Sequence, residues 1–286
     1  MQDLEFLKTR INHYENLINS LKNKKIRYQE NLLLYEISIF KKDLLKLQKL
    51  VKNYIQITIE QFYKIKLNEK QNFLKKFKSL ILNIPNITPN GVIVPKKENI
   101  KSYYKLQNFI FNLCSKYCLT KITDKIELCE VRLMRSNKFN YDNNRSYSSS
   151  KIHSDTWSGN PCDSKVVLFI DGDKNNTIEF LRPKKIDKSF FNKKKNYESA
   201  IKKYGFKKIK DLNHKKLTIF DQACLHRTKN TNTNLRLSVD FGIILKTNKN
   251  KIITLERYKH RFLKKKISLE KLKKILKPKS IHEKYN

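Results

Sequence analysis

Two short polar patterns, set among apolar segments far apart in the chain, constrain this sequence more than any other feature. The first is H-S-D, which begins at His153, and the second runs from His226 to an R-L-S triplet that begins at Arg236. His153 and Asp155 are two residues apart, so on a β-strand both side chains would project to the same side. His226 follows the apolar run Leu217–Phe220, which is typical of a core strand. The spacing therefore predicts that two histidines and a carboxylate meet at neighbouring strands.

The run Leu235–Leu245 has the alternation of a β-strand with two different faces. One face carries Arg236, Ser238 and Asp240, and the other carries Leu237, Val239 and Phe241. A guanidinium beside a hydroxyl suits a small dicarboxylate, because arginine binds a carboxylate through two hydrogen bonds and the hydroxyl adds a third.

Two histidines and one carboxylate are the ligand set of non-haem iron(II) sites, in which they occupy one face of the ion and leave positions open for a cosubstrate and oxygen. His214 is a rival second histidine, but the residue ten positions beyond it is Cys224, where His226 has an arginine. Cys162 and Cys224 could instead belong to a zinc site, yet the chain has no C-x-x-C pair, and a buried thiol is the commoner fate of such cysteines. The pattern therefore favours His226 and an open iron site.

The motif H-S-D-T-W-S-G-N-P, followed by Asp163 and the apolar run Val166–Asp171, resembles the iron(II)/2-oxoglutarate-dependent oxygenases. The resemblance is greatest to their phytanoyl-hydroxylase-like branch, which includes streptomycin-biosynthesis and carbohydrate-cluster enzymes, and it covers residues 128–245. It implies the following site residues: His153, Asp155 and His226 as iron(II) ligands, Arg236 as the partner of the distal carboxylate of 2-oxoglutarate, and Ser238 beside it.

The resemblance also implies an activity. We expect a dioxygenase that oxidises, most often by hydroxylation, a small substrate related to sugars or secondary metabolites. The alternative is a jelly-roll protein without catalysis that serves in binding or assembly through its helical arm. The complete ligand set, together with Arg236, argues against the alternative.

The charge of the chain is extreme, and it has two interpretations, a compositional one and a functional one. The formal net charge is +37, from 63 basic and 26 acidic residues, and only 10 of the basic residues are arginine. A lysine excess of this kind, with 5 glycines in 286 residues, fits a drift of the entire composition. Because arginine-rich and aromatic stacking motifs are missing, we expect no nucleic-acid partner. A small anionic substrate drawn by the positive field is the functional alternative.

Cysteine usage and hydropathy bear on the compartment. Five cysteines, an odd number, and no apolar signal segment predict a reducing cytoplasm rather than a disulfide framework. No apolar run approaches the roughly 18 residues of a membrane helix, so we expect no membrane partner.

The N-terminal region, residues 1–95, is predicted to be helical up to about residue 83. One apolar stripe begins at Leu4, and a second includes Ile37, Phe40, Leu47 and Val51. These stripes could form a short coiled coil and hence a homodimer, or they could pack on their own domain.

Residues 96–255 are predicted to form the core, of the α+β class: a double-stranded β-helix, or jelly roll, preceded by a helix near Tyr103–Tyr117. The expected strands are 126–134, 165–170, 177–181, 217–220, 235–245 and 252–255. A lysine-rich insertion, 182–214, contains a helical stretch at Tyr197–Tyr204 and could cover the site. Residues 256–286 are predicted to form a basic C-terminal helix.

Overall fold

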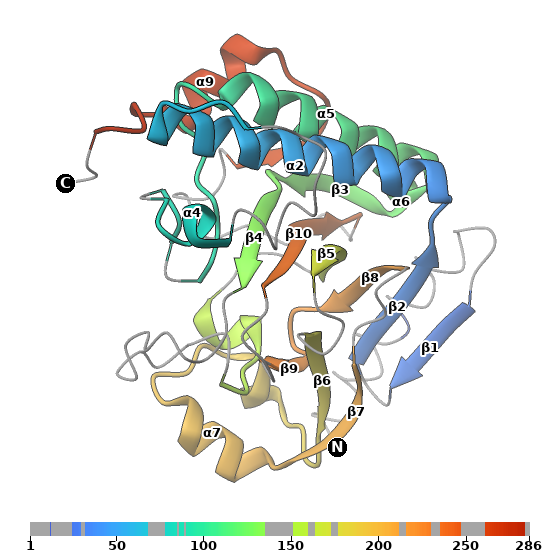
Figure 1. The fold of residues 1–286 in the computed structure, drawn as a ribbon. Helices are drawn as coiled ribbons and strands as arrows, with labels where there is room; N and C mark the ends of the chain where they lie inside the picture. The colour runs from blue at the N-terminus through green and yellow to red at the C-terminus, as the bar shows by residue number, and fades with distance from the viewer. Residues whose placement is uncertain are drawn as a thin grey trace.

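The computed structural model describes residue 12 and residues 25–29, 32–67, 78–84, 86–88, 90–134, 151–159, 164–172, 177–211, 216–229, 235–246 and 261–283. The sequence-predicted strand 252–255, the stripe that begins at Leu4, and His214 lie outside these residues. The described part of the chain is a mixed α/β structure with two antiparallel sheets and a layer of helices (Figure 1).

The larger sheet has eight strands in the order β1-β2-β8-β5-β10-β3-β11, with β4 also paired to β10. All of its neighbouring strands are antiparallel. The strands are β1 (Lys25–Gln29), β2 (Leu32–Ser38), β3 (Thr123–Glu127), β4 (Glu130–Met134), β5 (Ser164–Gly172), β8 (Lys216–Asp221), β10 (Arg236–Leu245) and β11 (Phe262–Leu263). Strand β10, with ten residues, is central and buried along its entire length.

The hairpin β1–β2 corrects the prediction of a helical N-terminal region. Residues 25–29 and 32–38 are two strands that extend the large sheet through β8, with Tyr35 opposite Ile219. The run N-L-L-L-Y-E-I-S is too short and too uniformly apolar for its period to separate a strand from a helix.

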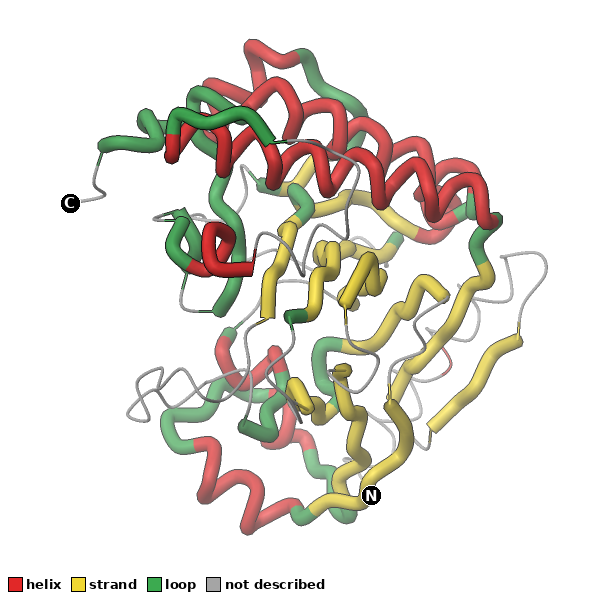
Figure 2. The backbone as a smooth tube through the Cα atoms, in the orientation of Figure 1, coloured by secondary structure: helices red, strands yellow, loops and turns green. Residues whose placement is uncertain are grey.

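Helices cover one face of the large sheet (Figures 1 and 2). They are α2 (Lys41–Tyr63), α4 (Lys78–Leu82), α5 (Ile100–Lys116), α6 (Leu119–Ile122) and α9 (Leu269–Leu276). The predicted stripe on α2 is confirmed for Leu47, Val51 and Tyr54, which are fully buried against the chain's own α5 and sheet. This stripe therefore packs on its own domain, which is the second of the two alternatives stated above.

The smaller sheet has three described strands in the order β7-β6-β9. They are β6 (Thr177–Pro183), β7 (Phe206–Asp211) and β9 (Leu225–Lys229). Between β6 and β7 lie a 3₁₀ turn, η2 (Lys188–Phe191), and helix α7 (Tyr197–Tyr204), which has the predicted bounds. The insertion is thus a folded hairpin with a helix, at the bottom of Figure 1.

The two faces of β10 differ as its alternation predicts. Leu237, Val239 and Phe241 belong to the apolar cluster shared with the helices. A second apolar cluster lies between the two sheets, with Val167 and Phe220 from the large sheet and Phe180 from the small one. The rings of Phe180 and Phe220 are 5.1 Å apart and meet edge to face. Neither sheet closes on itself within the described residues.

The C-terminal region is less helical than predicted. It contains the short strand β11 before α9, and α9 covers only Leu269–Leu276. Among the described residues no helix is long and apolar enough to cross a membrane.

Candidate metal centre

The H-x-D segment reaches its position without being a regular strand, which corrects the prediction. His153 makes a single antiparallel bridge to His226, and Asp155 begins a 3₁₀ turn, η1 (Asp155–Ser158). His226 is the second residue of β9, at the edge of the small sheet. The two histidines are therefore backbone neighbours, and the turn brings the carboxylate back toward them.

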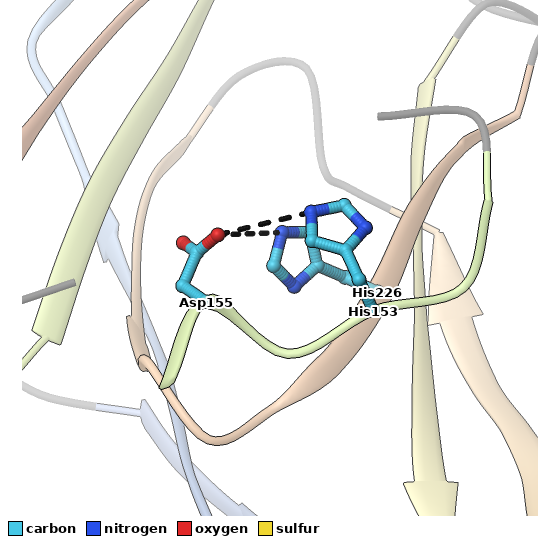
Figure 3. Close-up of side chains that lie close together, drawn as sticks. All are labelled: His153, Asp155 and His226. Atoms are coloured by element: carbon cyan, nitrogen blue, oxygen red, sulfur yellow. Dashed lines mark ion pairs between the residues drawn. The ribbon is translucent and has the colours of Figure 1, made fainter. Parts of the chain in front are cut away.

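The three predicted ligands lie together, as Figure 3 shows. Their ligand atoms are all within 4.8 Å of one another. Asp155 Oδ1 lies 3.7 Å from His153 Nε2 and 3.9 Å from His226 Nε2. The two imidazole rings are 4.3 Å apart between centroids. Asp155 and His226 are buried and His153 is half-buried, so the group is largely shielded from water.

The proton positions on both imidazoles follow from their backbone contacts. His153 Nδ1 lies 2.8 Å from the carbonyl oxygen of Lys151, and His226 Nδ1 lies 3.0 Å from that of Cys224. A carbonyl oxygen can only accept a hydrogen bond, so each Nδ1 carries the proton. In the neutral imidazole each Nε2 then presents a lone pair toward Asp155, which is the arrangement that backbone partners impose on metal-binding histidines.

The turn between β8 and β9 supports the carboxylate side of the site. The carbonyl oxygen of Gln222 accepts hydrogen bonds from Ser154 Oγ at 2.9 Å and from the Thr156 backbone N–H at 3.3 Å. Both residues that flank Asp155 are thus held by one residue. The Asp221 carboxylate in turn accepts from the backbone N–H of Ala223 at 2.8 Å.

His226 faces the space between the two sheets. It stands directly opposite Phe180 on β6, so both side chains lie on one face of the small sheet. Its ring is 5.2 Å from that of Phe220, on the large sheet. The candidate metal ligands therefore face the side of the large sheet that the described helices do not cover.

Arg236 and Ser238 lie on that uncovered face of β10, where the alternation predicts them. Both are about 1% exposed, and Nε and Nη1 of Arg236 have no hydrogen-bond partner in the part of the chain that the structure describes. Burial, and secondarily the charge of Arg132, lowers the pKa of the Arg236 guanidinium to about 9, although Asp240 opposes the shift. The group is still charged at neutral pH. A buried cation with two unsatisfied N–H groups is costly to the fold, and a bound anion would relieve that cost.

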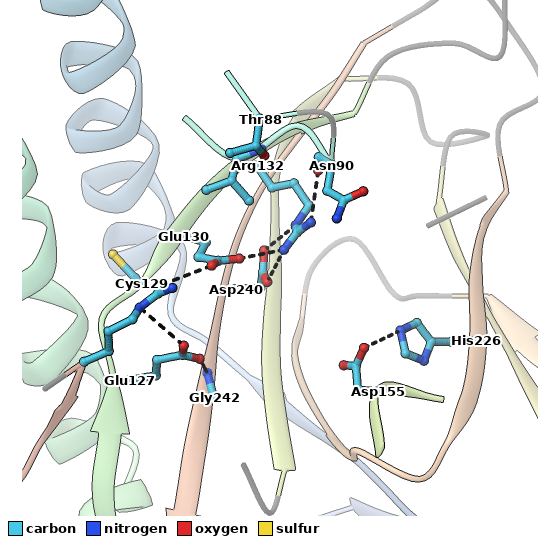
Figure 4. Close-up of polar contacts among 12 residues, drawn as sticks. Thr88, Asn90, Glu127, Cys129, Glu130, Arg132, Asp155, His226, Asp240 and Gly242 are labelled. Atoms are coloured by element: carbon cyan, nitrogen blue, oxygen red, sulfur yellow. Dashed lines mark hydrogen bonds and ion pairs between the residues drawn. The ribbon is translucent and has the colours of Figure 1, made fainter. Parts of the chain in front are cut away.

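Figure 4 shows a charge network around Arg132 that was not predicted from the sequence, and the charge of Arg132 acts on Arg236. Arg132, on β4 and opposite Ser238, binds Asp240 through two hydrogen bonds of 3.0 and 3.1 Å. It also donates to Glu130 at 2.7 Å, and Glu130 accepts from Arg261 at 3.1 Å. Burial alone would lower the pKa of Arg132, but Asp240 and Glu130 raise it above its usual value, with a further contribution from Asp155. In the sequence, this network is indicated by Arg132, a charged residue inside the apolar strand that is predicted before the H-S-D motif.

The structure also gives structural roles to Trp157 and Gly159 of the motif. Trp157 is fully buried among aromatic side chains of the insertion. Gly159 ends η1 with a φ of 77°, a left-handed conformation that favours glycine. Pro161 and Cys162 lie outside the described residues. Cys224 contributes its carbonyl oxygen to the site, and its thiol is not part of the group of potential ligands.

Comparison with known proteins gives no family for the chain. No protein-family model matches it, and no curated protein matches it either.

Proposed function

We propose that the protein binds iron(II) through His153, Asp155 and His226. One observation carries the proposal: the Nε2 atoms of two imidazoles and a carboxylate oxygen lie within 4.8 Å of one another, while each Nδ1 is within hydrogen-bond distance of a backbone carbonyl oxygen. With both imidazoles neutral and protonated on Nδ1, the three atoms are all acceptors, and a bound cation would offset their mutual repulsion. Two nitrogens and one oxygen from one side are the ligand set of iron(II) oxygenases, whereas structural zinc sites have four ligands and are closed.

We further propose 2-oxoglutarate as the cosubstrate, with Arg236 as the residue that binds its distal carboxylate. Nε and Nη1 of Arg236 are buried and have no hydrogen-bond partner among the described residues, which supports this assignment, since a planar guanidinium holds a carboxylate through two hydrogen bonds. Ser238 is two residues further along the same strand face and can add a hydroxyl donor. When bound, the metal and 2-oxoglutarate would together reduce molecular oxygen, with one oxygen atom going into the succinate that is formed with carbon dioxide and the other into the substrate.

The proposed fold is the jelly roll of this enzyme class. Strands β4, β10, β5 and β8 are consecutive neighbours in the large sheet; β9, β6 and β7 follow one another in the small sheet, and the His153 segment lies beside β9 through a single bridge. Two facing groups of four antiparallel segments are what a double-sheet jelly roll requires. The proposed activity is oxidation, with hydroxylation as the simplest outcome, of a small sugar-related or secondary-metabolite substrate of anionic character.

The deciding experiment is succinate release from 2-oxoglutarate, with and without iron(II), across a panel of nucleotide sugars, aminocyclitols, amino acids and acyl carriers. We expect iron-dependent succinate formation that one substrate class accelerates. His226→Ala, which removes one proposed ligand, should show none. Succinate release that is independent of iron and equal in the variant would overturn the proposal.

A further inference from the structure

The lysine-rich insertion has its own small core, so it is more than a solvated loop. Phe190, Tyr197 and Tyr204 are each less than 5% exposed. Asp187 stabilises the start of η2: its carboxylate accepts hydrogen bonds from the Phe190 backbone N–H at 2.8 Å and from Ser189 Oγ at 2.6 Å. The Tyr204 hydroxyl reaches the same carboxylate at 3.2 Å, which ties η2 to α7.

Trp157 is the point at which the insertion and the metal-binding segment meet. Its ring lies 5.5 Å from Phe190 and 5.5 Å from Tyr197, in both cases near the edge-to-face geometry that aromatic pairs prefer. Its indole N–H donates to the Phe190 carbonyl oxygen at 2.9 Å, and its own carbonyl oxygen accepts from the Lys194 backbone N–H at 3.0 Å. Trp157 thus belongs structurally to the core of the insertion.

Trp157 also belongs to the same 3₁₀ turn as Asp155. The Trp157 backbone N–H donates to the Ser154 carbonyl oxygen at 3.0 Å, and Ser158 Oγ donates to that of Asp155 at 2.8 Å. A turn of four residues with these internal bonds leaves little freedom between its first and third side chains. A displacement of Trp157 is therefore transmitted to the Asp155 carboxylate.

The insertion contacts the other side of the motif as well. Glu198, on α7, lies 3.4 Å from the Lys151 ammonium, and the Lys151 carbonyl oxygen is the partner of His153 Nδ1. Glu198 is 77% exposed, and exposed ion pairs contribute little to stability. The buried aromatic contacts of Trp157 are therefore the dominant connection.

From these contacts we infer that the insertion is a positioning element for the metal site, and that Trp157 is the residue through which it holds Asp155. The inference rests on the proposed metal centre and adds a role for a segment that otherwise suggests only a lid. It predicts that substitutions in the apolar core of the insertion lower the metal affinity, although the side chains of that core do not contact the ligand atoms.

The test compares two Phe→Leu substitutions. Phe190→Leu weakens the contact with Trp157, whereas Phe111→Leu removes the same atoms from α5, in the cluster on the other side of the large sheet. Metal affinity is measured by titration with cobalt(II), whose visible absorption reports on coordination without turnover. We expect about tenfold weaker binding in Phe190→Leu, the loss typical of residues that support metal ligands, and no change in Phe111→Leu.

A second measurement covers the case in which Phe190→Leu does not fold. Coupling between two sites is reciprocal, so cobalt(II) should in turn stabilise the insertion of the unmodified protein. Amide hydrogen exchange through local opening in Tyr197–Tyr204 should slow when cobalt(II) is added, and by a larger factor than any slowing that global stabilisation causes in α5. Trp157 is the only tryptophan, so its fluorescence reports directly on the same contact.

The outcomes separate the inference from the proposed function. Cobalt(II) binding that is equal in the unmodified protein and in Phe190→Leu, with unchanged exchange in α7, overturns the positioning role alone. An unmodified protein that binds no cobalt(II) or iron(II) overturns the metal centre and the positioning role together.

Discussion

His153 and His226 hydrogen-bond to each other through their backbones: each N–H donates to the other's carbonyl oxygen, at 3.0 and 2.9 Å. This single bridge joins two residues 73 positions apart in the sequence. Because the bridge fixes both Cα positions, and the Nδ1 contacts fix both rings, the two Nε2 atoms are placed before any ion arrives. A ligand set organised in advance gives up less conformational entropy on binding.

The first prediction concerns this ligand set. Replacing His153, Asp155 or His226 with Ala removes one of three ligands, so iron(II) or cobalt(II) affinity should fall by several orders of magnitude in each variant. Equilibrium dialysis with quantified metal gives the stoichiometry. In the unmodified protein, metal at 100 times its Kd should add about 2.7 kcal/mol to the free energy of unfolding.

His282→Ala is the matched control, because His282 is exposed on the C-terminal segment and is not part of the group. Its metal affinity should equal that of the unmodified protein. Retention of one bound ion and of activity by His226→Ala would remove His226 from the ligand set.

The second prediction concerns Arg236. Its buried charge has two unpartnered nitrogens, so Arg236→Met should raise the free energy of unfolding of the ligand-free protein by about 1–3 kcal/mol. The same variant should lose the stabilisation that 2-oxoglutarate gives to the unmodified protein. Arg236→Lys keeps the charge but loses the fork, so its 2-oxoglutarate affinity should fall while metal affinity is retained. Chemical denaturation with and without 2-oxoglutarate measures each effect.

Arg227→Met provides the comparison for Arg236. Arg227 is on β9, its side chain is 41% exposed, and it is paired with Glu179. The Arg227→Met variant should gain the same stabilisation from 2-oxoglutarate as the unmodified protein does. If Arg236→Met still gained the full stabilisation from 2-oxoglutarate, the cosubstrate assignment would fail and some other metal chemistry would have to be considered.

The sequence predicted those parts of the fold whose side-chain period reflects their burial. The alternation of Leu235–Leu245 matches the two faces of β10, and Tyr197–Tyr204 is α7 as expected. Strand β7 was missed, because F-K-K-I-K-D has no period of two. It is an edge strand of the small sheet, and lysines on an edge serve to discourage pairing with other chains.

The candidate ligands were correctly grouped for a reason that was partly wrong. The H-x-D spacing was interpreted as two positions on one strand, whereas a bridge and a 3₁₀ turn bring the same atoms together. Spacing restricts how far apart two side chains can be, but it does not determine the backbone between them. The contact of Trp157 with the insertion joins segments more than 30 residues apart, and no local pattern encodes such packing.

The third prediction concerns the network beside the site. Asp240 is 4% exposed and pairs with Arg132, so Asp240→Asn leaves a buried guanidinium with less compensation. We expect the free energy of unfolding to fall by about 3–5 kcal/mol. Replacing Arg132 as well, as in Arg132→Met with Asp240→Asn, should recover part of the loss, and a double-mutant cycle in urea measures the coupling.

Asp171→Asn is the corresponding test of an exposed pair. Asp171 lies 2.8 Å from Lys52, with both side chains at least 30% exposed. Its loss should cost less than about 1 kcal/mol. Equal effects of Asp171→Asn and Asp240→Asn would mean that the network near β10 is no more important than a surface pair.

The last prediction is a pH dependence of the insertion, set by Asp187. Burial would raise the pKa of this carboxyl, but hydrogen bonds from Ser189, from Lys203 and from the Phe190 backbone hold it well below its ordinary value of 3.8. A carboxyl whose pKa is lower in the folded state stabilises the fold above its ordinary pKa, and that contribution is lost as the pH falls through the folded value. In the unmodified protein the emission of Trp157 should therefore shift to longer wavelength as the solution is acidified below about pH 4. Asp187→Asn should have a less stable insertion already at neutral pH, and its Trp157 emission should equal that of the unmodified protein in acid.

Asp43→Asn is the control, since Asp43 also has a lowered pKa but lies on α2 beside Lys116 and Tyr117, in the helical layer. It should change stability in acid without moving the Trp157 emission before global unfolding. A Trp157 emission that responds to pH identically in the unmodified protein and in Asp187→Asn would show that Asp187 does not hold the insertion in place.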